Sequence, residues 1–147
     1  MKNITIMLIT IIIIVIVVTM ISLTYYLYKI EYRNIARENE EFEQYKDKEI
    51  YGIELATLIN RAIDKNTKNK IEKDSNNQFI TNEENSIEIE IYMEDSEQTY
   101  RMEMFYNTGI EQFIQYYGDV KFKCSKVELH EKTKRIKYLL FEQKVTS

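Results

Sequence analysis

No charged residue lies between Lys2 and Lys29, and this stretch constrains the fold more than any other part of the sequence. Its densest apolar part, ITIMLITIIIIVIVVTMISL, is about 20 residues long, which at 1.5 Å per residue matches a hydrocarbon core of roughly 30 Å. A soluble helix of that length would need a polar face. The polar side chains here are hydroxyls, which can bond to the preceding turn of their own helix. We therefore predict a transmembrane helix in segment 1–28, with residues 4–28 in contact with the lipid bilayer.

This helix is expected to remain in the protein as a signal-anchor. Its apolar run is longer than the usual run of about 7–15 residues in a cleaved signal peptide, and no A-x-A-like site follows it. Tyr25, Tyr26 and Tyr28 mark its polar boundary, as aromatic residues do at membrane interfaces. A prepilin-type leader is not indicated, because no glycine precedes the run and no glutamate lies just inside it. We expect a single-pass protein of the cell membrane.

The remainder of the chain is acidic. With 24 Asp and Glu and, once Lys2 is set aside, 19 Lys and Arg, residues 29–147 carry a formal net charge of −5. Phosphate backbones are bound by clustered positive charge, whereas the basic residues here are interspersed with acids. We therefore expect no nucleic-acid partner, and no anionic lipid surface as the main partner.

Two helical segments follow the anchor. Residues 29–48 contain no Gly or Pro, so the first helix is expected to continue to about residue 46 as a stalk. After Gly52, five apolar residues recur at the spacing of a core-facing stripe: Leu55, Leu58, Ile59, Ala62 and Ile63. We interpret this stripe as the helix that covers the sheet of a domain at 49–147, with docking of a partner as the alternative.

Two hairpins are expected in that domain. In SIEIEIYME every second residue is apolar, and the turn DSEQ leads to TYRMEMFY. This second strand would bury Tyr100, Met102, Met104 and Tyr106 and leave Arg101 to oppose a glutamate of the first strand. The Met and Tyr residues of this second strand could instead form a binding surface. A short helix ending at Gly118 is followed by VKFKCSKVELH, whose change of parity predicts a β-bulge near Ser125 and Lys126. The turn EKTK then leads to a last strand.

The expected fold class is α+β. An N-terminal transmembrane helix with a helical stalk would precede a small antiparallel sheet of two hairpins, about four strands, covered by one amphipathic helix.

The sequence offers no recognisable catalytic, cofactor-binding or metal-binding set. Its single histidine, His130, and single cysteine, Cys124, lie on either side of the parity change, and nothing requires them to meet. We expect Cys124 to be a small core residue and His130 to lie at a hairpin end. Acids are spread over solvated faces, and the three glycines are isolated. An enzyme is not expected, nor a cofactor.

The stretch FEQYKDKEIYGIELATLINRAI resembles a set of uncharacterised single-pass membrane proteins of low-GC Gram-positive bacteria. These share F-x-x-Y, then a glycine, then a leucine-rich helix start, which correspond here to Phe42, Tyr45, Gly52, Leu55, Leu58 and Ile59. Asp47 stands where a second, earlier glycine is expected. The resemblance implies a small domain outside the cytoplasm, pilin-like or part of a secretion or envelope assembly, and implies no enzyme activity.

We therefore expect a membrane-anchored, non-enzymatic binding or assembly subunit of a pilus-like, secretion or cell-envelope complex, with a protein partner or self-assembly. The alternative is a cytoplasm-facing, membrane-tethered regulatory or adaptor domain. Lys29, Arg33 and Arg37, close behind the anchor, favour that alternative by the positive-inside rule. A charged start of only three residues and the resemblance favour an extracytoplasmic domain, which is our expectation.

Overall fold

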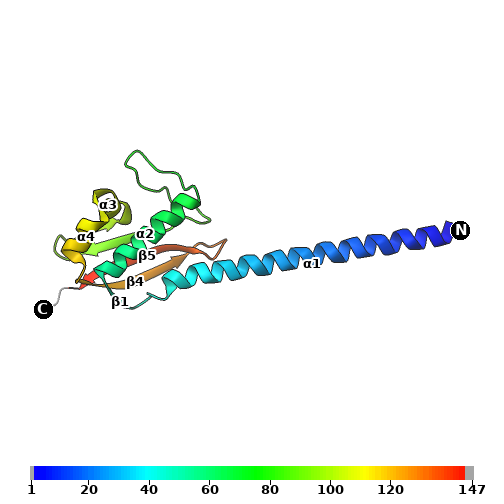
Figure 1. Cartoon of the computed structure of the whole chain (residues 1–147), viewed down its shortest axis with the longest axis horizontal. Coiled ribbons are helices and arrows are strands. Elements are labelled where there is room, and N and C mark those ends of the chain that lie inside the picture. Colours follow the sequence, from blue (N-terminus) through cyan, green and yellow to red (C-terminus); the bar gives the residue numbers. More distant parts are fainter. Residues whose placement is uncertain (1, 145–147) are drawn as a thin grey trace. The chain divides into compact units, whose positions relative to one another are not determined.

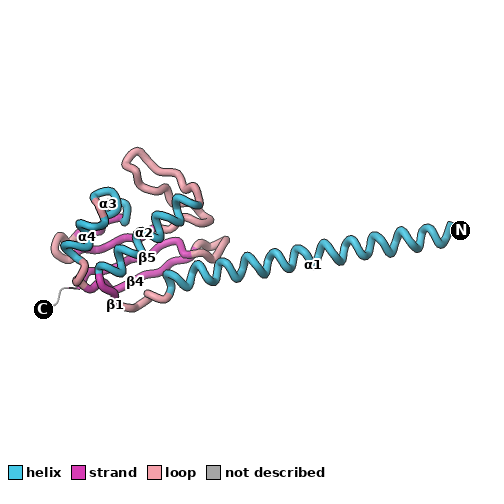
Figure 2. Tube along the Cα trace, viewed as in Figure 1, coloured by secondary structure: helices cyan, strands magenta, loops and turns pink. Residues whose placement is uncertain are grey.

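The computed structural model describes residues 2–144 and has the α+β class expected from the sequence (Figures 1 and 2). It forms two compact units, Met1–Arg37 and Glu38–Ser147, which are described separately below. The elements are α1 (Lys2–Glu43), β1 (Glu49–Tyr51), α2 (Gly52–Lys68), β2 (Glu88–Met93), β3 (Gln98–Arg101), α3 (Met102–Thr108), α4 (Ile110–Tyr117), β4 (Lys121–Leu129) and β5 (Ile136–Lys144).

Helix α1 begins in the apolar stretch and continues without interruption into the charged one. Its apolar side chains in the first unit are exposed. The hydroxyls of Thr10 and Thr19 donate to the carbonyls of Ile6 and Val15 at 2.9 and 2.8 Å, which satisfies them within the helix as expected. By its length and composition this helix can cross a membrane, and its exposure suggests that it anchors the protein there.

The last part of α1 belongs to the second unit. Asn39 and Phe42 are buried there, within the segment 29–48 that the sequence assigned to a helical stalk. The amide of Asn39 donates to the carbonyl of Lys134 at 2.7 Å and accepts from the N–H of Ile136 at 2.9 Å. The folded unit therefore includes the end of the helix.

Helix α2 packs on the sheet through the predicted stripe, every member of which is buried. Gly52, its first residue, lies against the end of α4. A Cβ at Gly52 would lie 1.9 Å from the carbonyl oxygen of Tyr117, so only glycine allows this approach. The Gly52 N–H also donates to the carbonyl of Val120 at 2.8 Å, which fixes the start of α2 beside β4.

The sheet has five strands in the order β1-β4-β5-β2-β3, and it is mixed. The two expected hairpins are present as β2–β3 and β4–β5, but β2 and β5 join them in parallel, with Ile89 opposite Leu139. The expectation of an antiparallel sheet of about four strands is thus only partly met. Strand alternation marks which face of a strand is buried, but it does not specify the neighbouring strand or its direction.

The second strand of the first hairpin is shorter than expected. It ends at Arg101, and the chain turns directly into α3, so Met102 and Phe105 are buried at helical spacing while Met104 and Tyr106 are 44% and 43% exposed. The expectation that Met104 and Tyr106 lie inside was wrong. Alternating residues in MEMFY fit a strand, but the i, i+3 pair of Met102 and Phe105 fits a helix equally well.

The β4–β5 hairpin agrees closely with the prediction from the sequence. The pairing register shifts between Cys124 and Lys126, at the predicted bulge, and shifts again between Glu128 and Leu129. Gly118 follows the last residue of α4, as predicted.

Candidate functional site

Cys124 and His130, the two side chains most often used for nucleophilic or metal chemistry, are both engaged in structural contacts. Cys124 is fully buried, and burial raises the pKa of its thiol to about 11. The His130 Nε2 lies 2.8 Å from the carbonyl oxygen of Ser86, so this nitrogen carries a proton. Within residues 2–144, no group of three or more His, Cys, Asp or Glu side chains could hold a metal ion.

An open recess of about 560 Å³ next to His130 contains carboxylates and lysines together. Lys132 donates to Glu83 at 3.0 Å and holds the pKa of Glu83 below its usual range. Lys126 lowers the pKa of Glu128 in the same way. A general acid at neutral pH needs a raised carboxyl pKa, so these pairings keep both groups ionised rather than prepare them for proton transfer.

The outer face of the sheet is polar and internally paired. Arg101 lies opposite Glu90 in the β2–β3 register and forms an ion pair with Glu88 at 3.2 Å, as predicted for the first hairpin. The hydroxyl of Tyr138 donates to Glu90 at 2.7 Å, and burial together with this carboxylate raises the pKa of Tyr138. The side chains named here are half-buried because they pack against one another, and they form a sheet face that is in contact with solvent.

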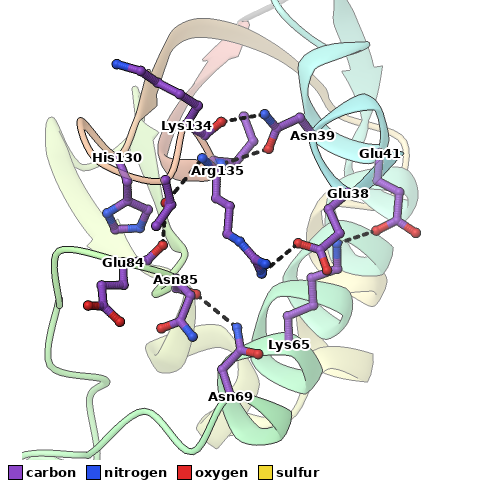
Figure 3. A network of polar contacts seen from close by, with 12 residues as sticks. Glu38, Asn39, Glu41, Lys65, Asn69, Glu84, Asn85, His130, Lys134 and Arg135 are labelled. Atoms are coloured by element: carbon purple, nitrogen blue, oxygen red, sulfur yellow. Dashed lines mark hydrogen bonds and ion pairs between the residues drawn. The ribbon is translucent and has the colours of Figure 1, made fainter. Parts of the chain in front are cut away.

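A polar recess of about 240 Å³ lies where the end of α1 meets α2 and the β4–β5 hairpin (Figure 3). Arg135 reaches across it to Glu38 at 3.1 Å, and Lys65 forms an ion pair with Glu41 at 2.7 Å and lies over the ring of Phe42. These cations are therefore already neutralised by carboxylates of α1.

The rim of the same recess is tied by hydrogen bonds to the backbone. Asn69 donates to the carbonyl of Asn85 at 3.0 Å, and Thr133 donates to that of Glu84 at 2.6 Å. With the Asn39 contacts described above, the network connects α1, α2, the loop before β2 and the hairpin turn. This network therefore has a structural role: it fixes the end of α1 to the rest of the second unit.

A second recess of about 240 Å³ has a different character and is the candidate binding site. We call it the aromatic groove. It lies between the β2–β3 turn and helices α3 and α4, and its lining is mainly aromatic and methionine side chains: Met93, Asp95, Ser96, Tyr100, Met104, Phe105, Thr108, Gln112, Phe113, Tyr116 and Tyr117.

A chain of ring contacts forms the floor of the aromatic groove. Tyr100 and Phe105 pack edge-to-face with centroids 5.9 Å apart, and Phe105 and Phe113 do so at 4.8 Å. Phe113 continues to Tyr117 at 5.5 Å and to Phe122 of the sheet at 5.9 Å. Such offset contacts stabilise each other beyond simple burial, so the floor is preformed by the core of the domain.

The wall of the groove is exposed. Met104 is 44% and Tyr116 is 72% exposed, and both side chains line the recess. Methionine and tyrosine are the residue types enriched in protein interfaces, because one is adaptable and the other combines a large apolar ring with a polar tip. These residues can therefore contact an apolar surface without any rearrangement of the floor.

One edge of the groove carries the acidic side chain of Asp95, and the chain segment around it is acidic overall. Residues 94–119 contain six acidic side chains and one basic side chain, Arg101, and this arginine is engaged by Glu88 and Glu103. Asp95 lines the groove, and Glu97, Glu111 and Asp119 are exposed on the same segment. Asp95 and the net negative charge of this segment are complementary to a partner that carries positive charge.

The sequence predicted no site residues, so the groove was found only in the structure. The sequence did offer one signal, the Met and Tyr content of TYRMEMFY, for which core packing was the preferred interpretation and a binding surface the alternative. In the structure, Met102 is in the core, whereas Met104 lines the groove.

Comparison with known proteins adds no assignment. No protein-family model matches the chain, and no significant match is found among curated proteins or solved structures.

Proposed function

We propose that the chain is a membrane-anchored, non-enzymatic binding subunit that docks a protein partner in the aromatic groove. The observation that carries the proposal is a preformed aromatic floor with exposed Met104 and Tyr116 above it, on a chain whose first helix suits a membrane. In interfaces, a few large side chains over a well-packed pocket supply most of the affinity.

The partner that fits this groove is an apolar segment flanked by basic residues. Its apolar side chains would contact Met104, Tyr116 and the ring of Phe105, and its basic residues would lie near the acidic edge. Charge complementarity of this kind speeds association and excludes acidic competitors.

We further propose that this binding takes place in a cell-envelope, pilus-like or secretion complex, with the domain outside the cytoplasm. The resemblance at 42–59 and the order of an apolar helix followed by an α+β domain support this setting.

The alternative is a cytoplasm-facing adaptor tethered to the membrane. One specific observation favours it: Lys29, Arg33 and Arg37 follow the apolar segment closely and are all exposed. The binding role of the groove is the same in both orientations, so the two proposals differ only in the compartment of the partner.

Gentle crosslinking in native membranes tests the binding role. The unmodified protein is expected to give a discrete species heavier than the monomer, and the double variant Met104→Ser with Tyr116→Ser is expected to lose most of it. The control is Tyr51→Ser with Ile80→Ser, which removes two similarly exposed apolar side chains that do not line the groove. A monomer alone in the unmodified protein would remove the basis of the assembly proposal.

A further inference from the structure

Three cations lie in one line along α1 directly after its apolar part. We call Lys29, Arg33 and Arg37 the basic stripe. They are spaced four residues apart, which in a helix of 3.6 residues per turn places them within an arc of about 80° on one side. All three are exposed.

Arg37 has acidic neighbours along the helix, Glu40 and Glu41 at i+3 and i+4, whereas Lys29 and Arg33 have none. Residues three or four positions away are close neighbours on a helix surface, and around Lys29 these are Tyr25, Tyr26, Tyr32 and Arg33. Within residues 2–144, no ion pair involves any of the three cations.

The spacing is unfavourable in an isolated helix. Lys29 with Arg33, and Arg33 with Arg37, are like-charge pairs at i, i+4, which destabilise a helix. Glu31, the acidic residue within the segment of the stripe, lies about 200° from Lys29 around the axis, on the other side of α1. The compensating negative charge for Lys29 and Arg33 therefore has to come from outside this segment.

The position of the basic stripe along α1 indicates where this negative charge comes from. Tyr25, Tyr26 and Tyr28 are exposed rings just before the stripe, and such rings lie at the level of the lipid headgroups. At 1.5 Å per residue, Lys29 is about 2 Å and Arg33 about 8 Å beyond Tyr28, and the headgroup layer is about 5–8 Å deep on each side. Arg37 lies further out, but its long side chain can extend back toward the layer.

We propose that the basic stripe binds the phosphates of anionic phospholipids in the leaflet next to Tyr28. Arg33 and Arg37 would bind phosphate oxygens through their planar guanidinium groups, and Lys29 as a point charge. The binding depends on insertion of α1 in a bilayer, but it depends neither on the aromatic groove nor on which compartment contains the domain.

Lipid selectivity of the full-length protein in liposomes of phosphatidylcholine tests this proposal. Trace spin-labelled phosphatidylglycerol or phosphatidylcholine is added, and electron paramagnetic resonance measures the fraction of each probe held by the protein. The phosphatidylglycerol probe is expected to be preferred by about twofold or more at low salt, and salt is expected to reduce this preference.

Variants distinguish the effect of the basic stripe from the effect of the protein's total charge. The triple variant Lys29→Gln, Arg33→Gln, Arg37→Gln is expected to abolish the preference, whereas Arg33→Lys with Arg37→Lys is expected to retain most of it. The control Lys48→Gln, Lys68→Gln, Lys123→Gln removes the same amount of charge from the second unit. It is expected to leave the preference for phosphatidylglycerol unchanged. Circular dichroism checks that each variant keeps its helix content.

Three results would overturn the proposal: equal association of the two probes with the unmodified protein, an unchanged preference in the triple glutamine variant, or an equal loss in the control. Either of the first two would show that the stripe does not bind anionic phospholipid.

Discussion

The side-chain amide of Asn66 forms two hydrogen bonds with the backbone of Ile87. Its Nδ2 donates to the carbonyl at 2.7 Å, and its Oδ1 accepts from the N–H at 2.8 Å. Asn66 is fully buried on α2, and Ile87 directly precedes β2. One side chain thus acts as a strand partner for the chain where it enters the sheet, and it connects the covering helix to the first hairpin.

Replacing Asn66 with alanine is expected to destabilise the domain by about 2–4 kcal/mol, because two buried backbone groups lose their partners. Denaturant unfolding of the full chain in detergent micelles, followed by near-ultraviolet circular dichroism, measures this loss. Asn60→Ala is the matched control on the same helix, since Asn60 is not buried. Equal losses in the two variants would contradict the role given to the amide.

Gly52→Ala is expected to destabilise the same domain by about 3 kcal/mol, since the added Cβ would collide with the backbone of Tyr117 and force α2 and α4 apart. The same unfolding measurement applies. The control Ile53→Ala changes the next residue, which is exposed, and is expected to change stability by no more than about 0.5 kcal/mol. A Gly52→Ala variant as stable as the control would show that this approach of α2 and α4 is incorrect.

Cys124 is expected to contribute stability that disappears at high pH. Burial raises its pKa to about 11 from an ordinary value of 9.0. The folded state therefore holds the thiol proton more tightly than the unfolded state. Its contribution is complete below pH 9 and decreases as the pH rises through 11, by about 1.4 kcal/mol per pH unit between these values.

The measurement is the difference in free energy of unfolding between the unmodified protein and Cys124→Ala across this pH range. The subtraction removes the tyrosines and lysines that titrate in the same interval. A difference that stays constant from pH 8 to 11 would mean that the thiol is not buried.

The orientation in the membrane can be decided with a cysteine in the loop before β2. Because Cys124 is fully buried, it cannot report on the compartment, so the experiment uses Ser75→Cys in a Cys124→Ala background. Ser75 is exposed in a polar turn. We expect an impermeant thiol reagent to label this cysteine in intact cells. Labelling only after the cells are opened would establish the cytoplasmic alternative.

The elements that local pattern determines were predicted well. The stripe of α2, the hairpin turns and the bulge at Cys124 each follow from a periodicity, or an interruption of one, within a few residues. The parallel pairing of Ile89 with Leu139 joins segments far apart in the chain, and no local pattern encodes it. The burial of Asn39 and Asn66 was missed for the same reason, because their partners are backbone groups of distant segments.

The candidate site was less predictable than the fold. In TYRMEMFY, Met102 and Met104 are identical residues two positions apart, yet one is in the core and the other lines the groove. Their roles depend on the end of β3 at Arg101, where the chain changes from a period of two to a helical period. A shift in that boundary by a few residues exchanges the buried and exposed sets.

The most direct test of the binding role places a photo-crosslinking phenylalanine derivative at Tyr116 in native membranes. The same derivative at Tyr51, which is exposed but does not line the groove, is the control. The account predicts one discrete crosslinked protein from position 116 and little or none from position 51. That protein should be crosslinked through an apolar segment flanked by basic residues. The same product from both positions, or none from position 116, would contradict the assignment of the aromatic groove as the docking site.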